Sequence, residues 1–537
     1  EKSLWRNLPS HAQSWAGIVN CWPLGVINAI ERGTEKAQRV ICGSILATVQ
    51  ALRARSSNSS YYVLTQGAVS TNPKDLVLHP HQSSAWGLVR TIVRELPDFP
   101  IQIVDLEGGS ESYPVETISS AFLYSATERQ IGIRGAKVLT PRLTAVSRPE
   151  GRGLLIRPDR AYMVVGAHGG LGASVVKWLV NQGAQELVMV GRRPHADSPA
   201  VKFLTSFGER RLKIHNLIFP ENVDFDVSTL QLDTVERPLG GVLHLAGTLS
   251  DQNIETMAWS EFFSPFPAKV DVAVNLVKYI SRMPEVPLVM FSSLASLIGS
   301  PGQSNYAAAN AFLDGLAASG KSNVFSINWG PWDGPGMADR IPPNLRATLM
   351  DGGVGFLAPE AALAVLGDIE LDSGGHCVVA TVDWARWPDK GGVFDRLVQG
   401  SPDTTIGGAL RTQLQQRPKA QRRGLLLKKL TEMVAGALHL DRESISPRAR
   451  LFDLGIDSLT AMQLRSALQL DLSTKLESTL LFDYPTLEKL AVHILDHYVN
   501  EDVAKASQKK KEDSNLGEKI DTSKLTAALE QLKASLN

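Results

Sequence analysis

Three polar residues in the second half of the chain have types and spacing that suggest acid–base chemistry. Ser293 follows Leu288–Ser292, an apolar run typical of a buried strand. Tyr306 and Asn310 are four residues apart in a segment of helical character, so they share one helix face. A serine hydroxyl can hydrogen-bond a substrate oxygen, and a tyrosine hydroxyl can donate a proton. Each residue alone would more often be structural, so the functional interpretation depends on their surroundings.

A glycine-rich turn upstream has the pattern of a nucleotide site. The strand-like run Tyr162–Val165 leads into Gly166-Ala-His-Gly-Gly-Leu-Gly172, and a helix is expected from Ala173 to Asn181. Glycines let the backbone approach a pyrophosphate, and the helix N-terminus supplies free N–H donors. Glycine patterns alone are weak signals, but the strand and helix around this one favour a dinucleotide site. The residues predicted to bind the cofactor here are Gly166, Gly169, Gly170, Leu171, Gly172 and, at a later strand end, Ala246.

Two arginines follow the next expected strand. Gly191-Arg192-Arg193 stands where a Rossmann fold meets the adenosine ribose of its cofactor. An acidic residue there would favour NAD, whereas arginines favour a 2′-phosphate and therefore NADPH. The alternative is a solvated basic turn with no ligand.

The elements that would position these residues alternate regularly between residues 160 and about 390. The expected strands are short, apolar and each followed by helical periodicity: Tyr162–Val165, Leu187–Val190, Val242–Ala246, Leu288–Ser292 and Val324–Trp329. This order predicts a doubly wound parallel sheet. Residues 1–150 also have α/β character, but no strand there leads into a glycine-rich turn, so no second nucleotide site is expected.

Together these motifs resemble the short-chain dehydrogenase/reductase superfamily, and more closely the ketoreductases of polyketide synthases. In that branch an asparagine replaces the usual lysine after the tyrosine, and a lysine stands earlier in the chain. The resemblance gives these roles to Asn310 and Lys269. It implies that hydride from NADPH reduces a β-keto group. Tyr306 would donate the proton, Ser293 would bind the carbonyl oxygen, Lys269 would lower the pKa of the tyrosine, and Asn310 would hold the lysine or a relay water.

The resemblance also covers the flanking segments. His244-Leu-Ala-Gly-Thr-Leu-Ser-Asp251, Asn328-Trp-Gly-Pro-Trp332 and Val382-Asp-Trp384 match the reductase family. Residues 1–150 resemble its structural subdomain, a truncated Rossmann-like unit without a cofactor. Two family marks concern stereochemistry: Asp251 ends a Leu-Ser-Asp version of the Leu-Asp-Asp motif, and Ile298 replaces a tryptophan. Both imply a D-configured (B1-type) hydroxyl.

A second resemblance lies near the C-terminus. Leu454-Gly-Ile-Asp-Ser458-Leu459 is similar to the phosphopantetheine site of acyl carrier proteins, and Phe482-Asp-Tyr-Pro-Thr486 matches the end of that fold. Ser458 would open a helix, whose N-terminus favours an anionic phosphodiester. Alone, such a serine would more often be a helix cap. With the flanking motifs, the resemblance implies covalent 4′-phosphopantetheine on Ser458.

The expected organisation is α/β followed by all-α. Tandem Rossmann-like subdomains (structural, then catalytic) precede a four-helix carrier domain and a helical tail. The predicted boundaries are 1–150, 151–395, a linker at 396–420, the carrier at 421–499, and a linker with a possible docking helix at 500–537. The tail carries leucines at heptad-like spacing, Leu525, Leu529, Leu532 and Leu536. A helix this short is marginal alone, so it is interpreted either as a docking segment or as a solvated tail.

Composition excludes some classes of function. The formal net charge is zero, so nothing indicates nucleic acid or an anionic membrane. No apolar run approaches the ~20 residues of a membrane helix, and Glu1 to Pro9 has no signal-peptide pattern. Cys21, Cys42 and Cys377 are far apart without metal spacing, so we expect reduced thiols, a cytoplasmic location and no metal.

The resemblance also implies partners. They are the ketosynthase and acyltransferase domains upstream in the same module, a phosphopantetheinyl transferase, and a downstream module reached through the C-terminal helix. Two alternatives remain: a reductase-inactive scaffold around a working carrier, and a fatty acid synthase fragment. Loss of Lys269, Ser293 or Tyr306 would have favoured the scaffold, and all three are present. No thioesterase-like serine elbow follows the carrier, which disfavours the second alternative.

Overall fold

The computed structural model describes two α/β units and a helical unit. The described residues are 17–27, 33–55, 59–72, 74–109, 117–118, 121–122, 128–145, 153–192, 198–206, 212–218, 227, 230, 232–334, 343–369, 375–387, 392–398, 410, 414, 417–438, 445–456, 461, 464–465, 468, 472, 476–477 and 480–499. The predictions for Arg193, for Ser458 and for the tail helix at 522–537 lie outside the described residues.

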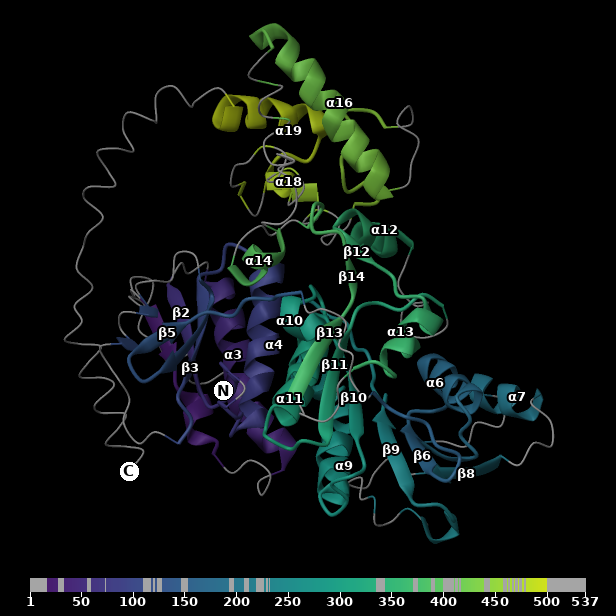
Figure 1. Ribbon diagram of the computed structural model, residues 1–537. Coiled ribbons are helices and arrows are strands. Elements are labelled where there is room, and N and C mark those ends of the chain that lie inside the picture. Colours follow the sequence, from purple (N-terminus) through teal and green to yellow (C-terminus); the bar gives the residue numbers. More distant parts are fainter. Residues whose placement is uncertain are drawn as a thin grey trace.

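The first unit is built on a five-stranded sheet in the order β1-β2-β3-β4-β5. The first four strands are parallel, and the last pairs antiparallel with β4. The strands are β1 (Gly17–Asn20), β2 (Ser60–Gln66), β3 (Ile101–Leu106), β4 (Gln130–Arg134) and β5 (Lys137–Leu139). The helices α3 (Thr34–Ala54) and α4 (Pro80–Glu95) pack beside this sheet (Figure 1). This is the truncated Rossmann-like unit that the resemblance implied.

The second unit is a seven-stranded sheet in the order β13-β11-β10-β9-β6-β7-β8, and every pair in it is parallel. Its strands are β6 (Ala161–Val165), β7 (Glu186–Gly191), β8 (Lys213–Ile218), β9 (Leu239–His244), β10 (Leu288–Ser293), β11 (Val324–Trp329) and β13 (Gly375–Val379). The chain runs outward from β6 in one direction and then returns to β9 on its other side. The strand order therefore reverses between β6 and β9, where open α/β sheets bind their ligands.

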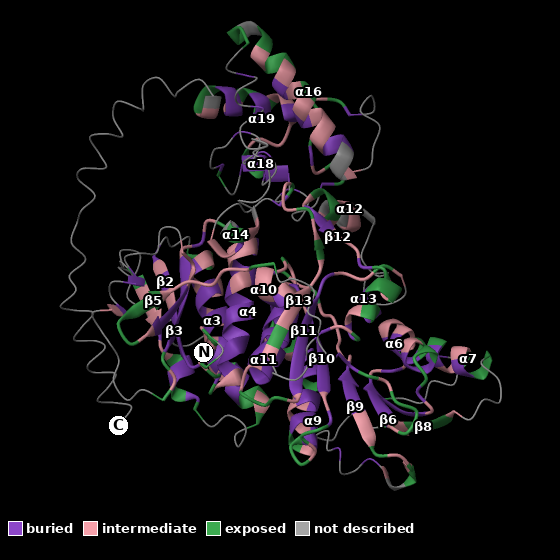
Figure 2. Ribbon diagram, in the orientation of Figure 1, coloured by how far each residue is buried: buried purple, intermediate pink, exposed green. Residues whose placement is uncertain are grey.

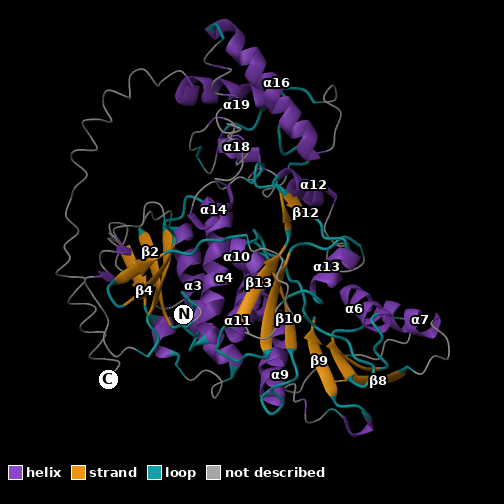
Figure 3. Cartoon of the chain, in the orientation of Figure 1, coloured by secondary structure: helices purple, strands orange, loops and turns teal. Residues whose placement is uncertain are grey.

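The predicted parallel sheet is confirmed, and two edge strands are added to it. Every residue of β6, β7 and β11 is buried, because helices cover both faces of the sheet (Figures 2 and 3). This burial explains their continuous apolar sequences. The added strand β8 is mostly exposed at the edge, so it lacks the apolar run by which the other strands were recognised. The remaining elements of this unit are α6 (Gly170–Asn181), α7 (Pro199–Ser206), α8 (Trp259–Phe263), α9 (Val272–Ile280), α10 (Ala295–Ile298), α11 (Ser304–Ala317), α12 (Pro343–Asp351), β12 (Val354–Gly355), α13 (Pro359–Val365), β14 (Thr381–Val382) and α14 (Asp395–Val398).

The two α/β units share one hydrophobic core. Helix α4 of the first unit lies against α11 of the second (Figure 1). The helices approach so closely that a Cβ atom added at Gly87 would lie 2.2 Å from the carbonyl oxygen of Ala307. Ile41 and Val89 of the first unit belong to the same buried cluster as Leu313 of the second. The units therefore form one packed body.

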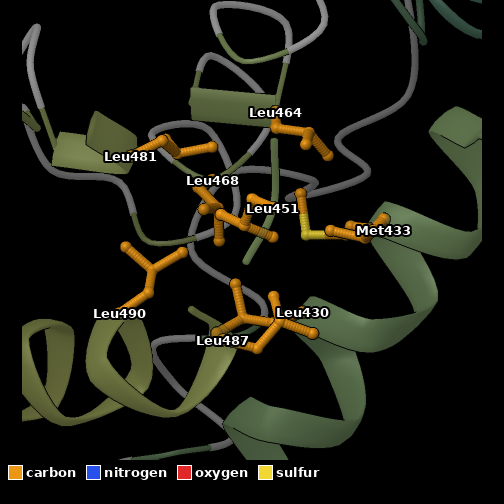
Figure 4. A pocket seen from close by; sticks show the side chains of 9 residues that line it. Leu430, Met433, Leu451, Leu464, Leu468, Leu481, Leu487 and Leu490 are labelled. Carbon is orange, nitrogen blue, oxygen red and sulfur yellow. The ribbon is translucent and has the colours of Figure 1, made fainter. Parts of the chain in front are cut away.

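The helical unit has a separate leucine-rich core. It contains α16 (Lys419–Leu438), α18 (Leu480–Asp483) and α19 (Leu487–Ile494). Figure 4 shows leucines of α16 and α19, with Leu451, Leu464 and Leu468, pointing toward a common centre. The start of α16 lies two residues before the predicted domain boundary. Within the described parts of the chain, no helix is long and apolar enough to cross a bilayer.

Candidate active site

Ser293 is the last residue of β10, at the carboxyl end of the sheet. Its Oγ accepts a hydrogen bond of 3.2 Å from the backbone N–H of Ala295, and its carbonyl accepts one of 2.9 Å from the Ser296 hydroxyl. The short helix α10 begins immediately afterwards. The strand end and the turn together hold the Ser293 side chain at the edge of the sheet where ligands bind.

Tyr306 lies in the first turn of α11 and is 8% exposed. Burial raises the pKa of its hydroxyl above the ordinary value, and hydrogen bonding with Asn310 and Ser293 opposes this shift. The negative charge of Asp251 raises the pKa slightly further. The hydroxyl is therefore protonated near neutral pH, beside the serine predicted to bind the carbonyl oxygen.

Lys269 lies in a π-helical turn, Pro267–Asp271, and is 2% exposed. Its Nζ donates a hydrogen bond of 3.0 Å to the carbonyl of Phe291 and lies 5.4 Å from the centroid of the Tyr306 ring. Burial lowers the pKa of the ammonium group to about 8, against the opposing charge of Asp314. The structure thus brings together the lysine, serine and tyrosine that the family resemblance had associated.

Asn310 is completely buried one helical turn after Tyr306. Its Nδ2 donates a hydrogen bond of 2.8 Å to the backbone carbonyl of Tyr306. Its Oδ1 is buried and has no hydrogen-bond partner among the described residues. The side chain therefore retains one acceptor for a lysine ammonium or a water, as its predicted role requires.

A buried acidic residue that the sequence analysis missed supports this arrangement. Asp314, on α11, is 6% exposed. It accepts hydrogen bonds of 2.6 Å from the Ser296 hydroxyl, 2.8 Å from the Ser326 hydroxyl and 2.7 Å from Nδ2 of Asn328. Ser296 in turn donates to the carbonyl of Ser293. The sequence offered one signal, since Asp314 is the single acidic residue in a helix of mostly small and apolar residues. A buried charge requires partners, so such a residue indicates a buried polar network.

The two residues predicted to control stereochemistry have different surroundings. Oδ2 of Asp251 accepts a hydrogen bond of 3.0 Å from Nε2 of Gln303, which precedes α11. Partial burial raises the pKa of Asp251, and this hydrogen bond opposes the shift. Ile298, in α10, packs beside the buried cluster that contains Trp387. Gln303 had not been identified from the sequence.

The glycine turn between β6 and α6 fits a pyrophosphate. Gly166 has φ +92°, and a Cβ added there would lie 2.8 Å from the backbone nitrogen of Ala246. A Cβ added at Gly172 would lie 2.3 Å from the carbonyl of Gly166. Gly169 is exposed and precedes α6, whose N-terminus has no side-chain cap. Its first amide groups are thus available to an anion, with Gly170 and Leu171 in that first turn.

The turn adjoins the residues predicted to be catalytic. Ala246, which packs against Gly166, is followed by Gly247. A Cβ added at Gly247 would lie 3.1 Å from Cε of Lys269, so a larger residue would press on the lysine. His244 is buried, and its Nε2 lies 2.8 Å from the carbonyl of Lys269. The glycine turn and the residues predicted to donate the proton therefore lie together.

The remaining predicted contacts are only partly described. Arg192 is exposed directly after β7, at the carboxyl end of the sheet beside the glycine turn.

In the helical unit, Gly455 has φ +99° shortly before the predicted attachment serine. The described residues contain no cluster of histidine, cysteine and acidic side chains suited to a metal ion.

This fold and this site define a nucleotide-dependent oxidoreductase of the short-chain type, joined to a small helical domain. Comparison with known families agrees with that assignment. Residues 160–334 match the family described as KR domain, and residues 428–494 match the phosphopantetheine attachment site. Residues 9–143 match the Rossmann fold domain of the polyketide synthase extender module SpnB.

Related proteins are polyketide synthases. The chain is 32% identical over 502 residues to polyketide synthase GfsA of Streptomyces halstedii, and this alignment covers 88% of this chain and 7% of that protein. It is 28% identical over 491 residues to the pikromycin polyketide synthase component PikAIII of Streptomyces venezuelae, covering 84% of this chain and 31% of that protein. The chain thus spans less than a third of the length of these relatives.

Solved structures agree with the fold. A structure of A-type ketoreductases from a modular polyketide synthase aligns with a TM-score of 0.60 at 26% identity, covering 72% of this chain and 81% of that one. An A1-type ketoreductase aligns with a TM-score of 0.58 at 27% identity, with the same two shares of the chains covered. The chain therefore belongs to the modular polyketide synthases and contains a ketoreductase domain and an acyl carrier domain.

Proposed function

We propose that this chain reduces a β-ketoacyl thioester, held on its own carrier domain, to a β-hydroxyacyl thioester with NADPH. The observation that carries this proposal is the constellation at the carboxyl edge of the sheet. The buried hydroxyl of Tyr306 interacts with Ser293, and the Lys269 ammonium lies 5.4 Å from the ring of the tyrosine. This constellation adjoins a glycine turn suited to a dinucleotide.

Each side chain has a separate task in the proposed reaction. NADPH would bind at the turn from Gly166 to Gly172 and supply the hydride. Ser293 would hydrogen-bond the ketone oxygen and orient it toward Tyr306, whose hydroxyl would donate the proton that the developing alkoxide needs. The positive charge of Lys269 would stabilise the tyrosinate that remains.

The preference for NADPH rests on the basic turn after β7. Arg192 is exposed at the sheet edge beside the glycine turn, where a 2′-phosphate would be met. A guanidinium group binds phosphate oxygens well because its planar donors match their geometry. Arg193 is the second residue proposed for this contact.

The carrier assignment makes Ser458 the attachment point of 4′-phosphopantetheine. The match of residues 428–494 to the phosphopantetheine attachment family supports it. A phosphopantetheinyl transferase would load the serine. The growing chain would come from ketosynthase and acyltransferase domains of the same module and pass to a downstream module through the C-terminal segment.

We further propose that the product has a D-configured hydroxyl without epimerisation at the α-carbon. Asp251 retains the final aspartate of the family's Leu-Asp-Asp motif, and Ile298 provides no indole to direct the pantetheine arm. Ala308 stands where family members that reduce epimerised substrates carry a proline. The test is reduction of a racemic 2-methyl-3-ketoacyl thioester by the purified chain with NADPH, followed by chiral chromatography. NADPH consumption with a dominant D-hydroxyl product supports the proposal. A dominant L-hydroxyl would overturn the stereochemical part, and absence of reduction would overturn the reductase.

A further inference from the structure

One carboxylate of the first α/β unit anchors two segments of the catalytic unit. Glu95 is the last residue of α4 and is 1% exposed. Its Oε1 accepts a hydrogen bond of 2.5 Å from the backbone N–H of Ile254, and its Oε2 accepts one of 2.9 Å from the backbone N–H of Gly302. Ile254 follows Asp251 closely, and Gly302 lies just before the tyrosine helix. Glu95 therefore binds both segments at once.

The two anchored segments also contact each other. The backbone N–H of Gln252 donates a hydrogen bond of 2.8 Å to the carbonyl of Gly302. Next to it, Nε2 of Gln303 donates one of 3.0 Å to Oδ2 of Asp251. The position of Asp251 relative to α11 thus depends on a small ring of hydrogen bonds that closes on Glu95.

The segment after Asp251 is fixed by the first unit on a second side as well. Nε2 of Gln50, on α3, donates hydrogen bonds of 2.9 Å to the carbonyls of both Ile254 and Met257. Arg53 forms an ion pair of 2.7 Å with Glu255. The segment therefore takes much of its conformation from the other subdomain.

We propose that Glu95 is a positioning residue: it sets the placement of Asp251 relative to Tyr306 and thereby the face of the ketone that is reduced. This inference rests on the proposed function. A carboxylate can satisfy both backbone N–H groups because it is acceptor-only, and such charge-assisted hydrogen bonds are strong. Glutamine has nearly the same shape but must present an NH₂ group to one of the two N–H donors.

A matched control exists in the same subdomain. Asp105 is completely buried, and its partners all belong to the first unit: the hydroxyl of Thr65 at 2.7 Å, the N–H of Ala68 at 2.9 Å and the guanidinium of Arg134 at 2.9 Å. Asp105→Asn perturbs a buried carboxylate of the first unit, as Glu95→Gln does. It leaves intact the contacts of the first unit with the segments that contain Ile254 and Gly302.

The experiment compares the purified wild-type chain, Glu95→Gln and Asp105→Asn by thermal unfolding, by kcat and KM, and by the stereoisomer ratio of the reduced thioester. We expect Glu95→Gln to lower kcat roughly 10–100-fold, as small misplacements of catalytic groups do, and to erode the stereoisomer ratio about tenfold. Asp105→Asn should keep the wild-type ratio and kcat even where its unfolding temperature falls. The second variant Glu95→Asp retains the charge but is one methylene shorter, so it should also erode the stereoisomer ratio, by less than Glu95→Gln does.

Several outcomes would overturn the inference. They are a folded Glu95→Gln with the wild-type ratio and kcat, or an Asp105→Asn that erodes the ratio equally. If Glu95→Gln does not fold, Glu95→Asp decides, and a folded Glu95→Asp with the wild-type ratio and kcat counts against the inference. A wild-type chain that reduces no β-ketoacyl thioester would instead refute the proposed function, and the inference with it.

Discussion

The ammonium group of Lys269 faces the ring of Tyr306, with Nζ 5.4 Å from the ring centroid and held by the carbonyl of Phe291 at 3.0 Å. Burial moves the two pKa values in opposite directions. The pKa of Tyr306 rises above its ordinary value, and that of Lys269 falls to about 8. At neutral pH the tyrosine is thus a protonated donor, and the lysine remains mostly charged.

This relationship predicts a pH dependence. Lys269 is charged below its pKa of about 8, so kcat should fall as pH rises through that value, because the neutral amine no longer stabilises tyrosinate. Lys269→Met should have lower kcat and a profile without this limb. The measurement is kcat from pH 6 to 10 for both proteins, with roughly constant ionic strength. An unchanged limb in the variant would assign the transition to another group.

The same pKa shift predicts the direction of a stability change. The folded-state pKa of Lys269 is about 8, below its ordinary value of 10.5, so between these values the unfolded chain binds more protons. The contribution of Lys269 to the free energy of unfolding should therefore increase as pH rises across that interval, which makes the folded state more stable. Denaturant unfolding of the wild type and of Lys269→Met, compared across the interval, isolates this contribution.

Tyr306→Phe should abolish turnover and leave NADPH affinity nearly unchanged. In the proposed reaction the hydroxyl acts only as proton donor, and the ring that packs beside Lys269 remains in the variant. Single-turnover kinetics and fluorescence titration of NADPH separate the two effects. Full activity of the variant would mean that another group is the acid.

Arg192→Ala should reduce kcat/KM for NADPH and leave that for NADH almost unchanged. One charge-assisted phosphate contact contributes about 1–3 kcal/mol, equivalent to roughly a 5–150-fold loss. Lys177→Ala, which removes an exposed lysine of α6, serves as the control for a general loss of positive charge. Equal losses with both cofactors would contradict the assignment of Arg192.

Ser458→Ala should prevent loading of the carrier domain. After coexpression with a phosphopantetheinyl transferase, intact mass spectrometry of the wild type should show the addition of one phosphopantetheine. The variant should keep its unmodified mass and still reduce a soluble thioester. A mass gain that survives the substitution would place the modification elsewhere.

Gly87→Ala should destabilise the reductase, because its added Cβ would lie 2.2 Å from the carbonyl oxygen of Ala307. Forcing the two helices apart is expected to cost about 1–3 kcal/mol. Gly25→Ala is the control in the same unit, since nothing lies within 4 Å of a Cβ added there. Thermal unfolding of both variants tests the difference, and equal unfolding temperatures would argue against tight packing at Gly87.

The sequence predicted the elements whose signals are local. The central strands were recognised because burial on both faces makes them continuously apolar, and the turn from Gly166 to Gly172 because its glycines lie between a strand and a helix. Tyr306 and Asn310 were paired by helical spacing. Lys269 could be associated with them only through family resemblance, since no periodicity links a π-helical turn to α11.

The residues that escaped prediction act across long distances in the chain. Glu95 meets Ile254 and Gly302 through tertiary packing, which leaves no pattern in the sequence around any of them. Asp314 was visible as an acid in an apolar helix, but its partners Ser326 and Asn328 lie on the strand β11, which follows that helix in the chain. The edge strand β8 was missed because its exposed residues give no apolar run.

The shared core between the two α/β units has a consequence for how such enzymes can be recombined. Gly87 packs against Ala307, and Glu95 accepts hydrogen bonds from Ile254 and Gly302. Each unit therefore supplies part of the buried surface of the other. A reductase assembled from the second α/β unit of one synthase and the first α/β unit of another would bring mismatched surfaces together beside the tyrosine. The two α/β units should therefore be exchanged together. Productive crossovers between synthases should lie before the first unit or after the second, and seldom between the two.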